Sequence, residues 1–227
     1  NGVSLAEVLH DAGYFTAATG KWHLDNKPND RGFDRYFGHL SGATNYWSGN
    51  DTWRLNREKW NDFGGDFYST DADTDYAIRF LQEAQKTDKP FFLYLAYNAP
   101  HAPLQAPREN MMKYVDRYKA GWDRVRKRRY QRQMEMGLFE KDWQLSPRPD
   151  HVPAWNSLSS DEKEWESMRM AAYAGLIDRV DENIGRLVRY LESTGEYDNT
   201  LFLFLSDNGA SAEQINRGDR KTSATLG

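Results

Sequence analysis

The chain has 227 residues, of which 39% are hydrophobic and 28% are charged, and its formal net charge at pH 7 is −4. The length allows a sizeable buried core, while the acidic balance gives no field that would favour nucleic acid as a partner. Cysteine is absent, which excludes disulfides, thiolate metal sites and a cysteine nucleophile within these residues. No apolar run approaches the roughly 20 residues that cross a bilayer, so we expect no membrane span.

The N-terminal third predicts a helix, a strand and a long irregular segment. Residues 4–11 open with Ser-Leu-Ala-Glu, a capping-box sequence that predicts a short helix. Residues 14–18 are apolar and predict a strand. Residues 26–65 are rich in Gly, Asn, Asp and aromatic side chains. We expect them to be irregular, with a hairpin around residues 53–60.

The middle of the chain predicts a second helix and a second strand. Apolar residues at helical spacing predict a helix that begins near Thr70 and ends before Pro90. Residues 91–97 form an unbroken apolar run, which is typical of a strand covered on both faces. Residues 108–137 predict two helical pieces, and residues 137–158 predict a polar excursion. The basic stretch in the first of these segments indicates a solvated helix rather than a nucleic-acid patch.

The last third predicts the longest helix and a third strand. Residues 159–193 begin with another capping box and carry apolar residues at helical spacing, and residues 201–205 are all apolar. Strands that alternate with helices predict an α/β fold, in which a largely parallel, mixed sheet is sandwiched between helices. Neither end shows a closing element, so we expect the fold to be incomplete at both ends.

Polar side chains follow each of the three predicted strands. Lys21 and His23 follow the first, His101 follows the second, and Asp207 and Asn208 follow the third. Because the carboxyl ends of parallel strands meet at one edge of a sheet, we expect these five side chains to share a site. His10, His39 and His151 have no partner at a useful spacing and are interpreted as structural.

Each of these groups has a functional and a structural interpretation. Two-residue spacing on extended backbone places Lys21 and His23 on one face, which suits a site that holds an anion and moves a proton. A solvated lysine and a surface histidine are the alternative. His101 lies in a proline-rich loop that would aim its ring at a leaving group, or it is a surface histidine. Asp207 and Asn208 offer the oxygen ligands that Ca²⁺ or Mg²⁺ prefers, or they form an Asx turn.

Three motifs in this order carry a resemblance to a known family. They are Gly-Lys-Trp-His-Leu at 20–24, Ala-Pro-His-Ala-Pro-Leu-Gln at 99–105 and Ser-Asp-Asn-Gly at 206–209. Together they resemble the sulfatases of the alkaline phosphatase superfamily, and most closely the bacterial arylsulfatases. The resemblance implies an alkaline-phosphatase-like fold. It also implies that residues 1–227 are part of a single catalytic domain, without its N-terminal nucleophile and metal segment and its C-terminal segment.

The resemblance also implies a role for each candidate residue in the hydrolysis of an aryl or carbohydrate sulfate ester. Lys21 would bind the sulfate, and His23 would contact the hydroxyl of a formylglycine nucleophile and take its proton. His101 would hold a sulfate oxygen or assist the departing alcohol. Asp207 and Asn208 would bind the divalent metal, usually Ca²⁺. The family further implies export to the periplasm, the cell surface or the lysosome.

The chain departs from the family pattern in several places. The Cys-x-Pro-Ser-Arg segment that supplies the formylglycine is absent, as are the upstream acidic pair of the metal site and the later lysine. Asp25 stands where the family commonly has Gly. We therefore expect these 227 residues alone to be inactive. A phosphonate monoester or phosphodiester hydrolase of the same superfamily, and a noncatalytic sulfatase-like binding protein, remain the alternatives.

Overall fold

The computed structural model describes residues 2–139 and 143–209. The chain divides into two compact units. The first consists of residues 1–105 together with 179–227, and the second of residues 106–178. In the described ranges the first unit holds the sheet, whereas the second consists of helices and loops. No helix of the described residues is both long enough and apolar enough to cross a membrane.

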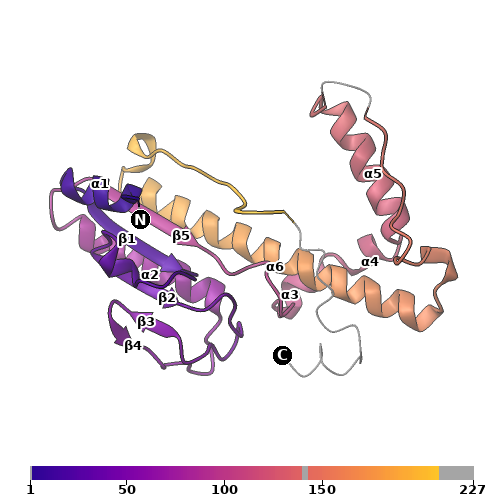
Figure 1. Cartoon of the computed structure of the whole chain (residues 1–227), viewed down its shortest axis with the longest axis horizontal. Coiled ribbons are helices and arrows are strands. Elements are labelled where there is room, and N and C mark those ends of the chain that lie inside the picture. Colours follow the sequence, from indigo (N-terminus) through magenta and orange to yellow (C-terminus); the bar gives the residue numbers. More distant parts are fainter. Residues whose placement is uncertain (1, 140–142, 210–227) are drawn as a thin grey trace. The chain divides into compact units, whose positions relative to one another are not determined.

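The sheet of the first unit has five strands, in the spatial order β4-β3-β2-β1-β5. They are β1 (Phe15–Gly20), β2 (Arg35–His39), β3 (Trp53–Leu55), β4 (Glu58–Lys59) and β5 (Phe91–Ala96). β1 lies between β2 and β5 and is parallel to both, while β3 and β4 continue the sheet antiparallel. The predicted mixed α/β sheet and the predicted hairpin are confirmed. The parallel strands β2, β1 and β5 therefore end at one edge (Figure 1).

Helices cover both faces of this sheet. α1 (Leu5–Asp11) has the predicted capping box, in which Glu7 N donates to Ser4 Oγ at 3.1 Å and Ser4 N donates to the Glu7 carboxylate at 2.6 Å. This helix packs on one face through Ala6, and α2 (Ser69–Ala84) packs on the other. The last turns of α6 (Ser160–Ser193) also cover the α2 face.

The core under α2 is dense in aromatic rings. Phe37 is fully buried and stacks on Tyr76 with 3.6 Å between ring centroids, and Trp53 is also fully buried. Burial of a large apolar side chain contributes about 1.5–3 kcal/mol relative to exposure. These rings therefore anchor β2 and β3 firmly against the helix.

The second unit contains short helices, an arm and the first part of α6. Its elements are α3 (Arg108–Met112), α4 (Val115–Tyr118), α5 (Trp122–Glu135) and η2 (Trp155–Ser157). The arm consists of α5 and the segment of residues 143–154 that returns along it. Three helical pieces replace the two that the sequence predicts. Asp178 links α6 to α3 and to the two residues that follow α3. Its carboxylate accepts hydrogen bonds at 2.5–2.7 Å from the side chains of Asn110, Lys113 and Tyr114.

The prediction that residues 26–65 are irregular outside the hairpin is wrong, because β2 lies among them. Its five residues carry little strand pattern, and Gly38 interrupts them. The strand forms because both of its neighbours offer hydrogen bonds, β1 on one side and β3 on the other. The strand also lies inside the sheet, and four of its five residues are buried. Tertiary packing thus overrides a weak local preference.

The prediction of a third strand at residues 201–205 is also wrong. These residues form no strand, and their side chains are 43–84% exposed. The 3₁₀ turn η3 (Tyr197–Asn199) precedes them. β5 forms as predicted, but it is not covered fully on both faces, because Tyr94 is 47% exposed.

Candidate active site

The chain that leaves β1 stays bonded to both neighbouring strands. Lys21 N donates to Ala96 O at 2.8 Å, and Trp22 N donates to His39 O at 3.0 Å. Gly20 makes this close passage possible, because its φ is +94° and an added Cβ would lie 2.0 Å from Ala96 O. Two backbone bonds thus fix the position of Lys21, whose side chain is half-buried.

His23 is aimed by a backbone turn rather than by strand alternation. Its φ is +51°, in the left-handed region, so the extended spacing that predicts a shared face with Lys21 does not continue to this residue. The extended backbone that the sequence predicts therefore ends before His23. The exposed His23 ring packs on Gly42, where an added Cβ would lie 2.8 Å from Cε1. A glycine in the facing loop therefore makes room for the imidazole.

His101 is held by the backbone of its own loop and by a buried tyrosine. Its N–H donates to Asn98 O at 2.9 Å, and its carbonyl accepts from the Tyr46 hydroxyl at 2.9 Å. Tyr46 is fully buried, and its N–H donates to Gln105 Oε1 at 2.9 Å. Nδ1 of the exposed ring lies 2.6 Å from Ala102 O. A donor at Nδ1 would leave Nε2 free for a ligand.

Buried His39 is influenced electrostatically by all three predicted side chains. Its ring is fully buried, and Nδ1 lies 2.9 Å from Ser41 O. Burial lowers the pKa of His39 to about 4, against the opposing effect of the Ser41 hydrogen bond, and the positive charges of Lys21, His101 and His23 lower it further. These three side chains therefore lie within electrostatic reach of one ring. The sequence alone indicates a structural role for His39, because β2, the strand that ends in it, has little pattern of its own.

Below this edge lies a layer of buried polar groups. Thr19 Oγ1 and both carboxylate oxygens of Asp73 are buried without a hydrogen-bond partner among residues 2–139 and 143–209. Burial raises the pKa of Asp73 well above its usual range. Sequence inspection missed Asp73, which reads as one of several acidic residues in the first turns of α2.

Asp207 and Asn208 lie next to each other in the stretch that follows residues 201–205. Asn208 N donates to Asp207 Oδ1 at 3.0 Å, and Ser206 Oγ donates to Asn208 O at 2.6 Å, as in a local polar turn. Burial raises the pKa of Tyr94, and the charge of Asp207 raises it further, so Asp207 is within electrostatic reach of β5. The described residues contain no group of three or more His, Asp or Glu side chains that could hold a metal.

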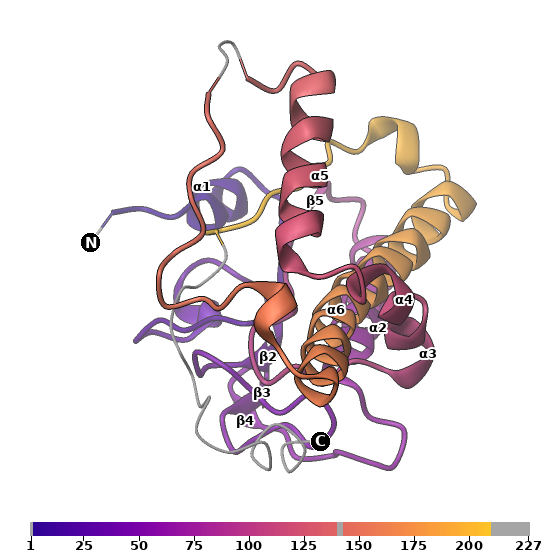
Figure 2. The same cartoon turned by 90° about the vertical axis from the view of Figure 1, so that its right-hand side faces the viewer.

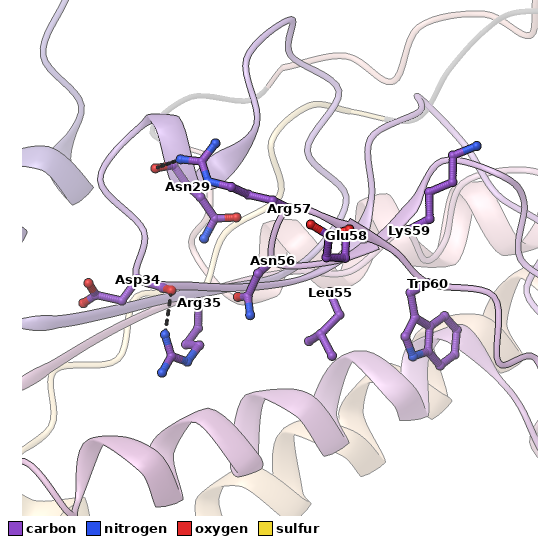
Figure 3. A pocket seen from close by; sticks show the side chains of 9 residues that line it. All are labelled: Asn29, Asp34, Arg35, Leu55, Asn56, Arg57, Glu58, Lys59 and Trp60. Atoms are coloured by element: carbon purple, nitrogen blue, oxygen red, sulfur yellow. Dashed lines mark hydrogen bonds between the residues drawn. The ribbon is translucent and has the colours of Figure 1, made fainter.

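An open pocket lies at the opposite end of β2 (Figure 3). It has a volume of about 560 Å³, and its lining includes Asp34 and Arg35 at the start of β2 and Arg57, Glu58 and Lys59 of the hairpin. β2 runs away from this pocket toward His39. The pocket therefore belongs to a different edge of the sheet from the strand ends that carry the candidate residues.

Comparison with known proteins identifies the family. The Sulfatase family model matches residues 2–226. An uncharacterised sulfatase of Schizosaccharomyces pombe is 37% identical over 91% of this chain and 41% of its own, and an arylsulfatase of Klebsiella aerogenes is 33% identical over 93% and 48%. The crystal structure of Ps i-CgsB with k-i-k-neocarrahexaose is 29% identical, with a TM-score of 0.55 over 86% of this chain and 37% of that one.

The match extends over nearly the whole chain and includes the three motifs at 20–24, 99–105 and 206–209. The chain spans less than half the length of these curated relatives. With its mixed sheet flanked by helices and its match to the family model, the chain belongs to the sulfatase family.

Proposed function

We propose that the full-length protein hydrolyses a sulfate monoester at the ends of β1, β2 and β5. The observation that supports this most strongly is that Lys21, His23 and His101 all lie within electrostatic reach of buried His39. Cationic donors at one site stabilise the charge of nonbridging oxygens, which a sulfate ester carries throughout hydrolysis. Family membership favours sulfate as the anion.

Each of the three side chains has a distinct role in this proposal. Lys21 is the half-buried cation that binds a sulfate oxygen. His23 holds or accepts the proton of the attacking hydroxyl, and His101 donates a proton to the ester oxygen as the bond to sulfur breaks. His39 does not titrate at neutral pH, because its pKa is about 4. It therefore supports the site as a neutral ring below the three donors.

The metal and the nucleophile are part of the proposal as well. Asp207 and Asn208 offer one anionic and one neutral oxygen donor, which fits Ca²⁺ or Mg²⁺ in chemical type, and further ligands would have to join them. Such a metal would supply positive charge to the sulfate oxygens. The formylglycine is expected outside these 227 residues. Sequencing the coding region upstream of Asn1 tests this, and a region without Cys-x-Pro-Ser-Arg or its Ser variant would contradict it.

We propose an aryl or carbohydrate sulfate as the substrate. The name of the Klebsiella relative, an arylsulfatase, supports the aryl class, and the hexaose bound in the Ps i-CgsB structure supports a carbohydrate. Most aromatic side chains of residues 36–60 are buried in the core, but Trp47 is 42% exposed and offers a surface on which either ring type can stack.

Paired substrates test the proposed reaction. The full-length protein is assayed with 4-nitrophenyl sulfate and with a 4-nitrophenyl phosphonate ester that has the same leaving group. We expect the sulfate to be hydrolysed with the higher kcat/KM. A clear preference for the phosphonate would favour a phosphonate monoester hydrolase, and hydrolysis of neither ester would favour a binding protein.

A further inference from the structure

The arm of the second unit carries a positive charge that the proposed hydrolytic site does not use. α5 contains six cationic and two acidic side chains, so its local net charge is +4 in a chain whose net charge is −4. Exposed cations in such a cluster attract polyanions over a distance of about one Debye length, roughly 8 Å at physiological salt.

One side of α5 is occupied by the chain that returns along it. Arg126 donates to Ser146 Oγ at 2.7 Å, and the hydroxyl of Tyr130 donates to the carbonyl of Trp143. Figure 2 shows this returning segment beside the helix. These contacts assign one face of α5 to packing within the arm.

The other side of α5 carries free cations. Arg124, Lys127 and Arg128 are exposed, and none has a hydrogen bond or ion pair from its side chain within the described ranges. Spacings of three and four residues place Lys127 and Arg128 on the same face as Arg124, about 4.5 Å and 6 Å from it along the axis, with Arg126 on the opposite side. Lys127 also lies three residues from Tyr130, whose hydroxyl donates to the carbonyl of Trp143. Like charges at these spacings destabilise a helix. A bound row of anions would relieve that repulsion.

The arm also presents an exposed aromatic surface. Trp143 is 62% exposed, and its ring stacks on Phe139 with 5.8 Å between centroids, while Phe139 lies 6.0 Å from the Tyr130 ring. An indole backed by other rings offers a rigid apolar face to which a sugar ring can pack. Cations together with an aromatic face fit a sulfated carbohydrate better than they fit a polyanion without rings.

We propose that this face of α5, with the neighbouring indole of Trp143, binds the chain of a sulfated polysaccharide as an accessory surface. The proposal rests on the proposed function, since it assigns the polymeric form of a carbohydrate sulfate to the substrate. Arg124, Lys127 and Arg128 bind sulfate groups along the polymer, and Trp143 packs on a sugar ring.

Binding of heparin to the full-length protein tests the cationic face. In the variant Arg124→Gln/Lys127→Gln/Arg128→Gln we expect about tenfold weaker binding in 0.15 M salt. The slope of log affinity against log salt should also fall by about 2. The matched control, Lys59→Gln/Lys86→Gln/Lys89→Gln, removes three exposed lysines of the first unit and should bind heparin as the wild type does.

A second variant and a second polymer test the role of Trp143 in packing on a sugar ring. Trp143→Ala should weaken binding of heparin several-fold and leave binding of polyvinyl sulfate, which has no sugar rings, unchanged. Wild-type kcat/KM on 4-nitrophenyl sulfate should persist in both arm variants, whereas kcat/KM on a sulfated polysaccharide falls. Absence of hydrolysis of both 4-nitrophenyl sulfate and the sulfated polysaccharide by the wild type would reject the proposed function separately from the binding result.

Three outcomes would overturn the accessory surface. The first is unchanged heparin affinity in the triple variant, and the second is an equal loss in the lysine control. The third is tighter binding of duplex DNA than of heparin, with the same dependence on the three cations, which would assign the face to nucleic acid.

Discussion

β5 and residues 201–205 are two apolar runs of similar composition with opposite outcomes. Each follows a helix and precedes polar candidate residues. β5 pairs with β1 along its whole length, from Phe91 to Ala96. Residues 201–205 pair with no strand in the described structure, and Leu201 and Phe204 are both 84% exposed. An apolar run becomes a strand only where a neighbouring backbone supplies its hydrogen bonds.

The same contrast separates the two halves of the candidate site. Lys21 is fixed by a backbone bond to β5, and His101 is fixed by a bond within its own loop and by the hydroxyl of buried Tyr46. Asp207 and Asn208 are fixed only by bonds within their own turn. The proposed anion-binding half thus has contacts beyond its own turns, whereas the proposed metal half needs further partners.

The largest expected difference between β5 and residues 201–205 is in their rates of amide hydrogen exchange, measured on the 227-residue chain. Amides of β5 bonded to β1 should exchange at least about 10³-fold more slowly than those of residues 201–205, because only the former need an opening of the sheet. Mass spectrometry or NMR measures both segments in one sample. Similar protection in the two segments would break the comparison.

The next largest expected effect is the loss of activity when Lys21 is replaced. In the full-length protein, Lys21→Met should lower kcat/KM on 4-nitrophenyl sulfate by at least about 10²-fold, since a charged donor to the sulfate is lost. Lys89→Gln, an exposed lysine without a side-chain partner in the described ranges, serves as the control and should keep wild-type kinetics. Wild-type kcat/KM in Lys21→Met would remove this residue from the site.

The buried ring of His39 predicts a dependence of stability on pH. Its pKa is about 4 in the folded protein and about 6.5 in the unfolded chain, so the unfolded chain binds more protons between these values. The contribution of neutral His39 is complete above pH 6.5. About 3 kcal/mol should be lost as the pH falls toward 4.

Urea unfolding of the wild type and of His39→Asn between pH 7 and pH 4 measures this effect. The variant should lack this part of the pH dependence, because Asn does not titrate. Parallel curves for the two proteins would show that His39 ionises normally, and would contradict its close burial beneath Lys21, His23 and His101.

A small change in the facing loop should have the smallest effect. Gly42→Ala adds a methyl group 2.8 Å from Cε1 of His23, so the imidazole must shift. We expect about a tenfold lower kcat, with unfolding free energy changed by less than about 1 kcal/mol. Gly64→Ala is the matched control, because nothing lies within 4 Å of the added methyl. Equal activity of the two variants would show that the His23 position is not critical.

Local signals account for the elements that the sequence predicts correctly. The capping boxes that begin α1 and α6 are visible as Ser and Glu three residues apart, and the structure contains both. β1 and β5 are apolar runs that have partners. Lys21, His23 and His101 were found because each follows such a run, although the site residues themselves stay predictions until they are tested.

Elements that depend on distant partners were missed or wrongly predicted. β2 has little pattern of its own and forms because β1 and β3 flank it, so His39 at its end was overlooked. Residues 201–205 have a strong pattern and no partner among the described residues. Asp73 is one of several acidic residues in α2, and only the packing of the helix shows that it is buried. Such features depend on contacts between segments that are distant in the sequence. A local pattern of residues does not encode those contacts.

Competition by inorganic sulfate tests most directly whether this edge of the sheet binds the anion. The inhibition constant of sulfate against hydrolysis of 4-nitrophenyl sulfate is measured for the full-length wild type, for Lys21→Met and for Lys89→Gln. We expect sulfate to bind at least about tenfold more weakly to Lys21→Met, as loss of one charged hydrogen bond implies, and equally to the control. Wild-type affinity for sulfate in Lys21→Met would contradict the assignment of the sulfate to the ends of β1, β2 and β5.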